Sequence, residues 1–163
     1  MDLQTILNGI SFLESHSVLV GVPGDNAGRS GPLNNVELAF LHSNGSPLMR
    51  IPARPFLEPA LENGETQQKI EGCMKRAIIE ALEGNTGGAR AEMEKAGLYG
   101  QKAAQEMIGS GALAPNAPIT INGGWMRNRV SGKPVYIKGK GSSAPLIDTG
   151  SLRQAITYVV EGS

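Results

Sequence analysis

The sequence predicts an α+β fold: a small, mostly antiparallel sheet covered by helices, with long exposed loops. Short β-branched segments lie near both ends of the chain, at residues 17–22 and 155–160. Between them, apolar residues recur at the three-to-four-residue spacing of helices. Strands at both ends with helices between them favour such a layered arrangement. At 163 residues and 17.1 kDa, the chain has the size of a single domain, 1–163, with one hydrophobic core.

The first part of the chain predicts two helices around one strand. An amphipathic helix is expected over residues 2–14, and the strand at 17–22 follows it. Residues 23–32 carry glycine and proline at both ends and little to bury, which predicts an exposed, flexible loop. Asn34 and Glu37 have the spacing of a capping box, so a second helix is expected to begin there and to end at a glycine. The apolar positions of the first helix are Leu3, Ile6, Leu7, Ile10 and Leu13.

The middle of the chain predicts an extended tract and two helices. Residues 51–59 hold three prolines, which keep the backbone extended and exclude it from a central sheet. Helices are expected over about residues 60–83 and 89–108. Gly97 and Gly100 lie on one face of the second of these, and each costs about 1 kcal/mol relative to alanine. Either another helix approaches this face closely, or the helix is interrupted near Gly97.

The last third of the chain is predicted to be irregular. Residues 109–128 are rich in turn-forming residues, a short strand is expected at 135–137, and a basic loop region spans about residues 127–144. Asp148 is expected to cap a helical turn over residues 151–154, before the C-terminal strand.

The charge of the chain is balanced overall but not locally. Fifteen basic and fifteen acidic residues give a formal net charge of zero, which argues against a protein that holds nucleic acid mainly through its phosphates. Beyond residue 120 the basic residues are in excess: Arg127, Arg129, Lys133, Lys138, Lys140 and Arg153 stand against Asp148 and Glu161. This excess predicts either a solvated flexible loop or a surface that faces an acidic partner or passing DNA. Aromatic residues make up only 4%, so platforms for base stacking are not expected.

Few residues could carry catalysis or bind a metal. His16 and His42 are the only histidines, and both lie where a capping or surface role is expected. Cys73 is the single cysteine and is interpreted as a small buried hydrophobe. The glycine-rich stretches 84–88 and 138–143 lack the full pattern of a phosphate-binding loop. We therefore expect no enzyme activity, no cofactor and no metal site, and no apolar run approaches the roughly 20 residues that span a bilayer.

Two tracts are unusually specific in residue order. Residues 51–61 read Ile-Pro-Ala-Arg-Pro-Phe-Leu-Glu-Pro-Ala-Leu, and residues 145–157 read Pro-Leu-Ile-Asp-Thr-Gly-Ser-Leu-Arg-Gln-Ala-Ile-Thr. Together they resemble the neck and tail-completion proteins of tailed bacteriophages, among them the phage Mu G-like virion morphogenesis family. There an Ile-Pro-Ala-Arg-Pro-Phe-Leu segment leads into a helix, and a Leu-hydrophobic-Asp-Thr-Gly-x-Leu-Arg segment leads into a C-terminal strand. The resemblance does not extend to residues 86–144.

The resemblance implies a structural virion protein that forms a homo-oligomeric ring at the head-tail junction, between the connector and the tail. The expected partners are further copies of the chain, the connector or adaptor protein and the tail-terminator protein, with passing contact to DNA in the channel and none to a membrane. The protein would be made in the host cytoplasm and reside in the virion. A tail terminator or a minor capsid assembly factor is the alternative within this class. The alternative from another class is a small enzyme that binds phosphate-bearing ligands through residues 138–143.

The candidate assembly residues come from the two tracts and from the basic region: Arg54, Phe56, Leu57, Asp148, Thr149, Arg153, Lys133, Lys138 and Lys140. Arg54 lies between prolines and either meets a carboxylate, for which Asp148 is one candidate, or covers Phe56 and holds its own loop in place. The three lysines are expected to contact an acidic protein tier; the alternative is that they line the DNA channel.

Overall fold

The computed structural model describes residues 2–28, 32–47, 51–128, 131–146 and 150–162, and its fold is α+β, as the sequence predicts. The elements follow in the order α1 (Leu3–Ser15), β1 (His16–Gly21), η1 (Gly24–Asn26), α2 (Asn35–Asn44), α3 (Glu58–Leu61), α4 (Gly64–Leu82), α5 (Thr86–Gly109), α6 (Pro118–Asn122), β2 (Gly124–Arg127), β3 (Pro134–Ile137), α7 (Ser151–Ala155) and β4 (Thr157–Gly162). Within these residues the strands form two separate antiparallel pairs, β1 with β4 and β2 with β3.

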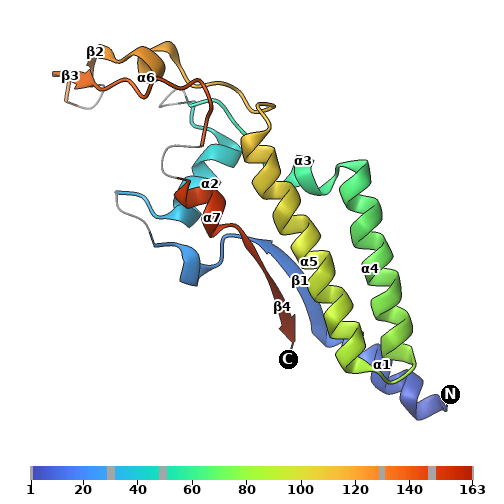
Figure 1. Ribbon diagram of the computed structural model, residues 1–163. Coiled ribbons are helices and arrows are strands. Elements are labelled where there is room, and N and C mark those ends of the chain that lie inside the picture. Colours follow the sequence, from blue (N-terminus) through green and yellow to red (C-terminus); the bar gives the residue numbers. More distant parts are fainter. Residues whose placement is uncertain (1, 29–31, 48–50, 129–130, 147–149, 163) are drawn as a thin grey trace.

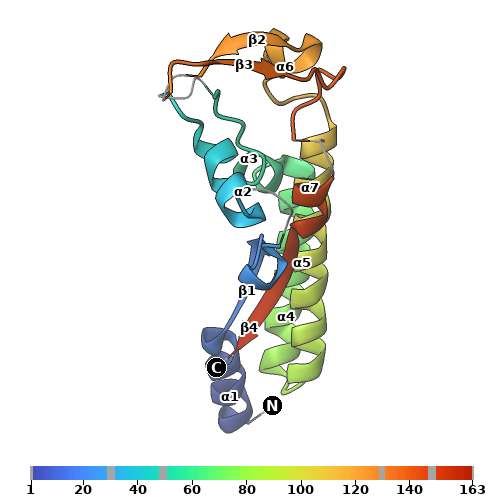
Figure 2. The same ribbon diagram turned by 90° about the vertical axis from the view of Figure 1, so that its left-hand side faces the viewer.

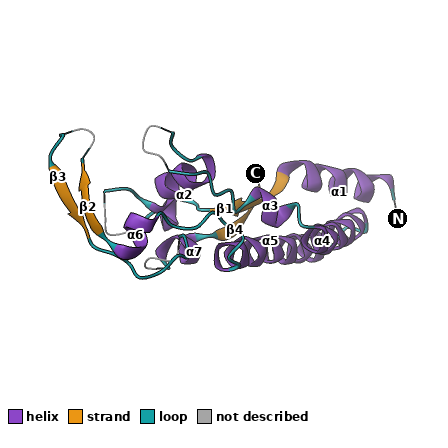
Figure 3. Cartoon of the chain, turned by 90° about the horizontal axis from the view of Figure 1, so that it is seen from above, coloured by secondary structure: helices purple, strands orange, loops and turns teal. Residues whose placement is uncertain are grey.

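The helices α4 and α5 form an antiparallel hairpin on which the other elements are arranged (Figure 1). The β1–β4 pair lies along α5, and α1 packs against α4. The helices α2 and α7 contact each other beside the other end of α5 (Figure 2). The β2–β3 pair projects beyond this point together with α6, so that it lies at the opposite end of the molecule from α1 in all three views (Figure 3).

The glycines of α5 allow the β1–β4 sheet to lie directly on the helix. The helix is continuous from Thr86 to Gly109. A Cβ atom at Gly97 would lie 2.4 Å from Cδ2 of Tyr158, and one at Gly100 would lie 2.9 Å from Cγ2 of Val20. The predicted close approach to this face is therefore confirmed, and the neighbours are the β1–β4 pair and, at Gly100, also Leu61 of the short helix α3. Packing of the sheet offsets the low helix propensity of glycine, so the alternative of an interrupted helix is wrong.

Gly97→Ala is expected to destabilise the protein, whereas Gly72→Ala is expected to stabilise it. At Gly97 the new methyl group would overlap the Tyr158 ring, and overpacking of this kind costs about 1 to 3 kcal/mol. Gly72 lies inside α4, where a Cβ would meet only the end of the Arg76 side chain at 3.6 Å, so alanine there gains helix propensity of up to about 1 kcal/mol. Urea unfolding of both variants measures the difference. Equal shifts of the two midpoints would contradict this packing.

The register of the β1–β4 pair gives the sheet one covered and one open face. Val20 lies opposite Tyr158, and both face α5. Leu19 lies opposite Val159, and these two side chains are 49% and 39% exposed. Because neighbouring residues of a strand point to opposite faces, the open face of the sheet carries these apolar groups.

The capping box at the start of α2 is present as predicted. The backbone N–H of Asn34 donates to Oε2 of Glu37 at 2.9 Å, and the backbone N–H of Glu37 donates to Oδ1 of Asn34 at 2.8 Å. The helix ends before Gly45, which has a φ of 69°.

A second asparagine at the start of α2 joins three segments of the chain. The side-chain amide of Asn35, 2% exposed, donates to the carbonyl of Gly28 at 3.1 Å. Its carbonyl accepts a hydrogen bond from the hydroxyl of Ser151, also at 3.1 Å. The described part of the predicted loop 23–32 is thus attached to α2 and α7 and contains the short helix η1.

The segment after α5 is more regular than the sequence predicts. The supposedly turn-rich residues 109–128 contain α6 and β2, and β2 pairs with the predicted strand near residue 135. The basic residues expected on a loop therefore lie on and around a β-hairpin. The N-cap of α7 is Gly150, which makes no side-chain cap. Asp148, the expected cap, lies outside the described residues.

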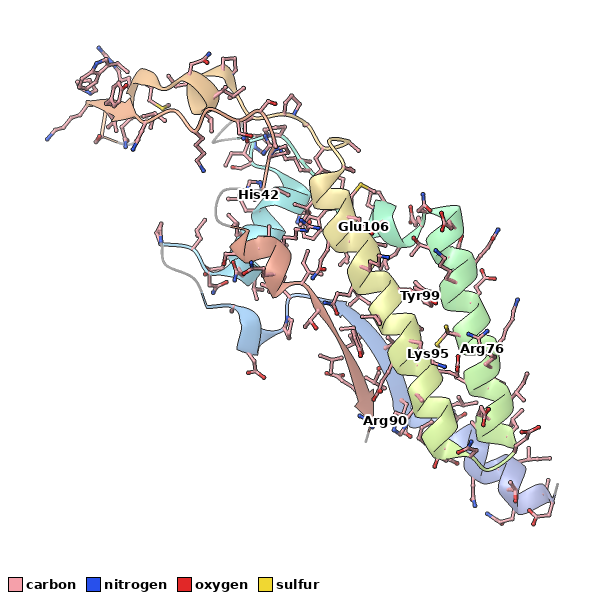
Figure 4. All side chains as sticks on the ribbon, viewed as in Figure 1. His42, Arg76, Arg90, Lys95, Tyr99 and Glu106 are labelled. Atoms are coloured by element: carbon pink, nitrogen blue, oxygen red, sulfur yellow. The ribbon has the colours of Figure 1, made fainter. Side chains whose placement is uncertain are left out.

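Charged side chains connect α4 and α5. Figure 4 shows Arg76 and Lys95 where the two helices face each other. Nε of Arg76 donates to Glu92 at 2.8 Å, and Lys95 donates to the other carboxylate oxygen of Glu92. The hydrogen bonds from Lys95 and Arg76 lower the pKa of Glu92 from its usual value. Cys73, 1% exposed, lies beneath Arg76, as expected for a small buried hydrophobe.

Candidate interaction surfaces

The two specific tracts of the sequence meet in the core of the protein. Phe56 of the first tract and Leu152 and Ile156 of the second are each no more than 3% exposed and belong to one apolar cluster. The cluster is completed by residues of α3, of α5 and of the segment that follows α5: Ala60, Ala104, Ile108 and Leu113. Leu57 packs against it as a partly buried neighbour. The residue order of these tracts therefore has a packing role inside the chain.

Arg54 is buried and binds the backbone of a distant segment. Arg54 is only 5% exposed. Its Nε donates a hydrogen bond to the carbonyl of Ala114 at 2.6 Å, and its Nη2 donates one to the carbonyl of Pro115 at 2.9 Å. Burial lowers the pKa of Arg54 from its usual value, although a guanidinium stays protonated in proteins. The structure supports the interpretation in which Arg54 holds its own loop in place, but by joining that loop to residues 114–115.

The remaining candidate residues are distributed between the surface and the part of the chain that is not described. Asp148 and Thr149 lie outside the described residues, so the structure does not test Asp148 as a candidate partner of Arg54. Arg153 is exposed in the last turn of α7. Lys133, Lys138 and Lys140 are exposed on the β2–β3 hairpin or at its base.

The β2–β3 hairpin is apolar on both faces. Trp125 lies opposite Tyr136 with ring centroids 5.4 Å apart, and the two side chains are 72% and 58% exposed. The next pair, Met126 and Val135, points to the other face and is 41% and 39% exposed. An isolated two-stranded hairpin is only marginally stable in water. A surface of this kind, with an exposed tryptophan and tyrosine, is typical of a protein contact site.

The base of the hairpin is held to α6 and to the segment that precedes α6. The backbone N–H groups of Lys140 and Gly141 donate to the carbonyls of Thr120 and Ile121 at 2.9 Å each. The side chain of Asn116 donates to the carbonyl of Ala144 at 2.9 Å. These amides at residues 140 and 141 are thus engaged inside the chain and are not directed at a phosphate-sized ligand.

Helix α1 has an exposed apolar stripe on its outer side. Gly9 faces α4, where a Cβ would lie 2.3 Å from the carbonyl oxygen of Ala81. The opposite side of α1 therefore faces solvent. Leu3, Leu7 and Ile10 form its stripe and are 72%, 48% and 41% exposed. These residues are among the apolar positions of the predicted amphipathic helix, and they are exposed because the close contact at Gly9 sets the rotation of the helix.

Opposite charges are concentrated at the two ends of the molecule. Residues 107–147, which include α6 and the β2–β3 hairpin, contain five Lys or Arg and no Asp or Glu. Residues 1–15 and 77–89, which include α1 and the end of α4, contain four carboxylates and no Lys or Arg: Asp2, Glu14, Glu80 and Glu83. The formal net charge of zero is thus the sum of +5 at the first of these ends, −4 at the second and −1 in the rest of the chain, which includes Arg90 at the start of α5.

Groups with catalytic potential lie apart from one another in the described residues. The ring of His16 stacks on Phe12 at 3.9 Å, and its Nδ1 lies 2.8 Å from the carbonyl of Phe12, which gives it a local structural role. His42 belongs to α2, and its carbonyl accepts the backbone N–H of Arg54 at 2.6 Å. In the part of the chain that is described, no three His, Cys, Asp or Glu side chains are grouped to hold a metal ion. Every helix described there is too short or too polar to cross a membrane.

Comparison with known proteins adds no assignment to these surfaces. The chain matches no protein-family model, no curated protein and no solved structure.

Proposed function

We propose that the protein is a structural subunit of a tailed-phage particle, located in the neck or tail-completion ring that joins the connector to the tail. The observation that carries this proposal is the amount of apolar surface that one copy leaves exposed. The β2–β3 hairpin, the α1 stripe and the open face of the β1–β4 sheet each present large apolar side chains to solvent. Subunits that fold into an assembly cover such surfaces with neighbouring molecules.

The resemblance of the two tracts to neck and tail-completion proteins supports the same class. In this chain the two tracts pack on each other around Phe56 and Ile156. Because the two tracts contact each other in one core, a change in one tract affects the packing of the other. This explains why a family would keep the residue order of both tracts. Contacts with other molecules of the particle are then expected at exposed surfaces outside this core.

The enzyme alternative has less support. It requires residues 138–143 to hold a phosphate group, and two backbone amides of that segment already donate to carbonyls of α6. Backbone amides that cradle a phosphate need to be free of internal partners. A tail terminator or a minor capsid assembly factor uses the same kind of exposed surface and is distinguished by experiment.

Particles assembled without this protein are expected to accumulate as complete heads and complete tails that are not joined. Adding the purified protein is expected to restore joining, and negative-stain microscopy counts the joined particles. Tails of abnormal length would instead identify a tail terminator, and malformed heads a capsid assembly factor. Normal joined particles in the absence of the protein would contradict the proposal.

A further inference from the structure

The β2–β3 hairpin has the features of a contact that is completed by another molecule. Its four central side chains are apolar and exposed on both faces, with Trp125 72% exposed. Aromatic residues of this type provide much of the binding energy in protein interfaces. The basic residues Arg127, Lys133 and Lys138 surround these groups, and none of them takes part in an ion pair with a described residue. A molecule that binds this hairpin is therefore expected to present both apolar side chains and acidic groups.

The α1 end of the same chain has these complementary properties. Leu3, Leu7 and Ile10 follow one another at helical spacing on its outer side. Glu14 continues this stripe one turn further on and is exposed. The same chain thus carries both a basic, apolar hairpin and a helix surface that is apolar and acidic, and these two surfaces are complementary.

The two surfaces cannot meet within one molecule. The hairpin and α1 lie at opposite ends of the chain, separated by the length of α5 (Figures 1 and 2). We infer that the β2–β3 hairpin of one copy docks on the α1 stripe of a second copy, head to tail. Such a contact joins different surfaces of identical subunits, so it propagates from copy to copy and gives a ring where the rotation closes. The inference rests on the proposed function for the expectation that copies of the chain assemble; the pairing of the surfaces comes from their charge and exposure.

Cysteine cross-linking tests the pairing directly. One preparation carries Leu7→Cys and a second carries Tyr136→Cys; both sites are exposed, and the native Cys73 is buried and does not compete. In a mixture of the two, under mild oxidation, a disulfide-linked pair that contains one copy of each variant is expected. Lys75→Cys, on an exposed position in the middle of α4, is the matched control and is expected to give no such pair with Tyr136→Cys.

Charge reversal tests the same contact without cross-linking. Lys133→Glu with Lys138→Glu is expected to weaken self-association roughly tenfold or more, because like charges then face each other across the contact. Glu14→Lys is expected to weaken self-association as well. All three changes in one chain restore opposite charges and are expected to restore assembly. Light scattering over a concentration series gives the apparent dissociation constants.

Three results would overturn the inference: equal cross-linking of the control, self-association that is unchanged by either charge reversal, or a hairpin that binds DNA in a salt-sensitive manner without any cross-link to Leu7→Cys. If the purified protein stays monomeric, the same cysteine pairs are examined in assembled particles, and absence of the cross-link there overturns it as well. If the pairing is absent but heads and tails still join normally only when the protein is present, the proposed function stands and the inference fails. If the pairing occurs but joining does not require the protein, the proposed function is contradicted and the inference stands.

Discussion

Replacing Phe56 with alanine is expected to lower the free energy of unfolding by about 3 to 5 kcal/mol. The ring is 3% exposed and lies in the cluster where the two specific tracts, α5 and the segment after α5 meet. Its removal leaves a cavity among side chains that come from four parts of the chain, so none of them can move in without losing other contacts. Urea unfolding, followed by circular dichroism, measures the change.

Phe40→Ala is the matched control for this substitution. Phe40 lies on α2 and is 71% exposed, so its truncation is expected to change stability by less than about 0.5 kcal/mol. Similar losses for the two phenylalanines would show that Phe56 does not occupy the core described for it.

Arg54→Ala is expected to lower the free energy of unfolding by about 2 to 4 kcal/mol, since hydrogen bonds to a charged group contribute about 1.5 to 3 kcal/mol each and do not add fully. The substitution removes both donors to residues 114–115 and leaves those carbonyls without this partner. Arg54→Lys keeps the charge but not the planar pair of donors, so an intermediate loss is expected.

Head-tail joining is expected to fall in parallel with the stability of the Arg54 variants, because the contacts of this side chain are internal. Arg153→Ala removes an exposed arginine and is expected to change stability by less than about 0.5 kcal/mol. A stable Arg54→Ala protein that fails in joining would contradict the internal role and return Arg54 to the list of contact residues.

Local patterns in the sequence were sufficient to predict most of the regular elements. The helices follow from apolar spacing, the start of α2 follows from Asn34 and Glu37, and the strands at both ends follow from β-branched residues. These features depend on residues within one or two turns of each other. The pairing of β1 with β4 fits the predicted antiparallel sheet, although the sequence did not give its register.

The features that were missed depend on contacts between distant segments. The partner of Arg54 lies 60 residues away, and no local pattern indicates it. The orientation of α1 depends on Gly9 fitting against the backbone of Ala81, which the spacing of apolar residues does not indicate. Strand β2 was not recognised because it has only four residues and begins at the second of two adjacent glycines. Trp125 and Tyr136 were visible in the sequence as large aromatics, but only their cross-strand pairing shows them as one exposed surface.

Cryo-electron microscopy of the intact particle tests the central claim most directly. We expect density for this chain in the tier between the connector and the tail, with α5 recognisable by its length and the β2–β3 hairpin in contact with a neighbouring molecule. Particles whose neck is fully accounted for by other proteins, with this chain absent from the head-tail junction, would contradict the account.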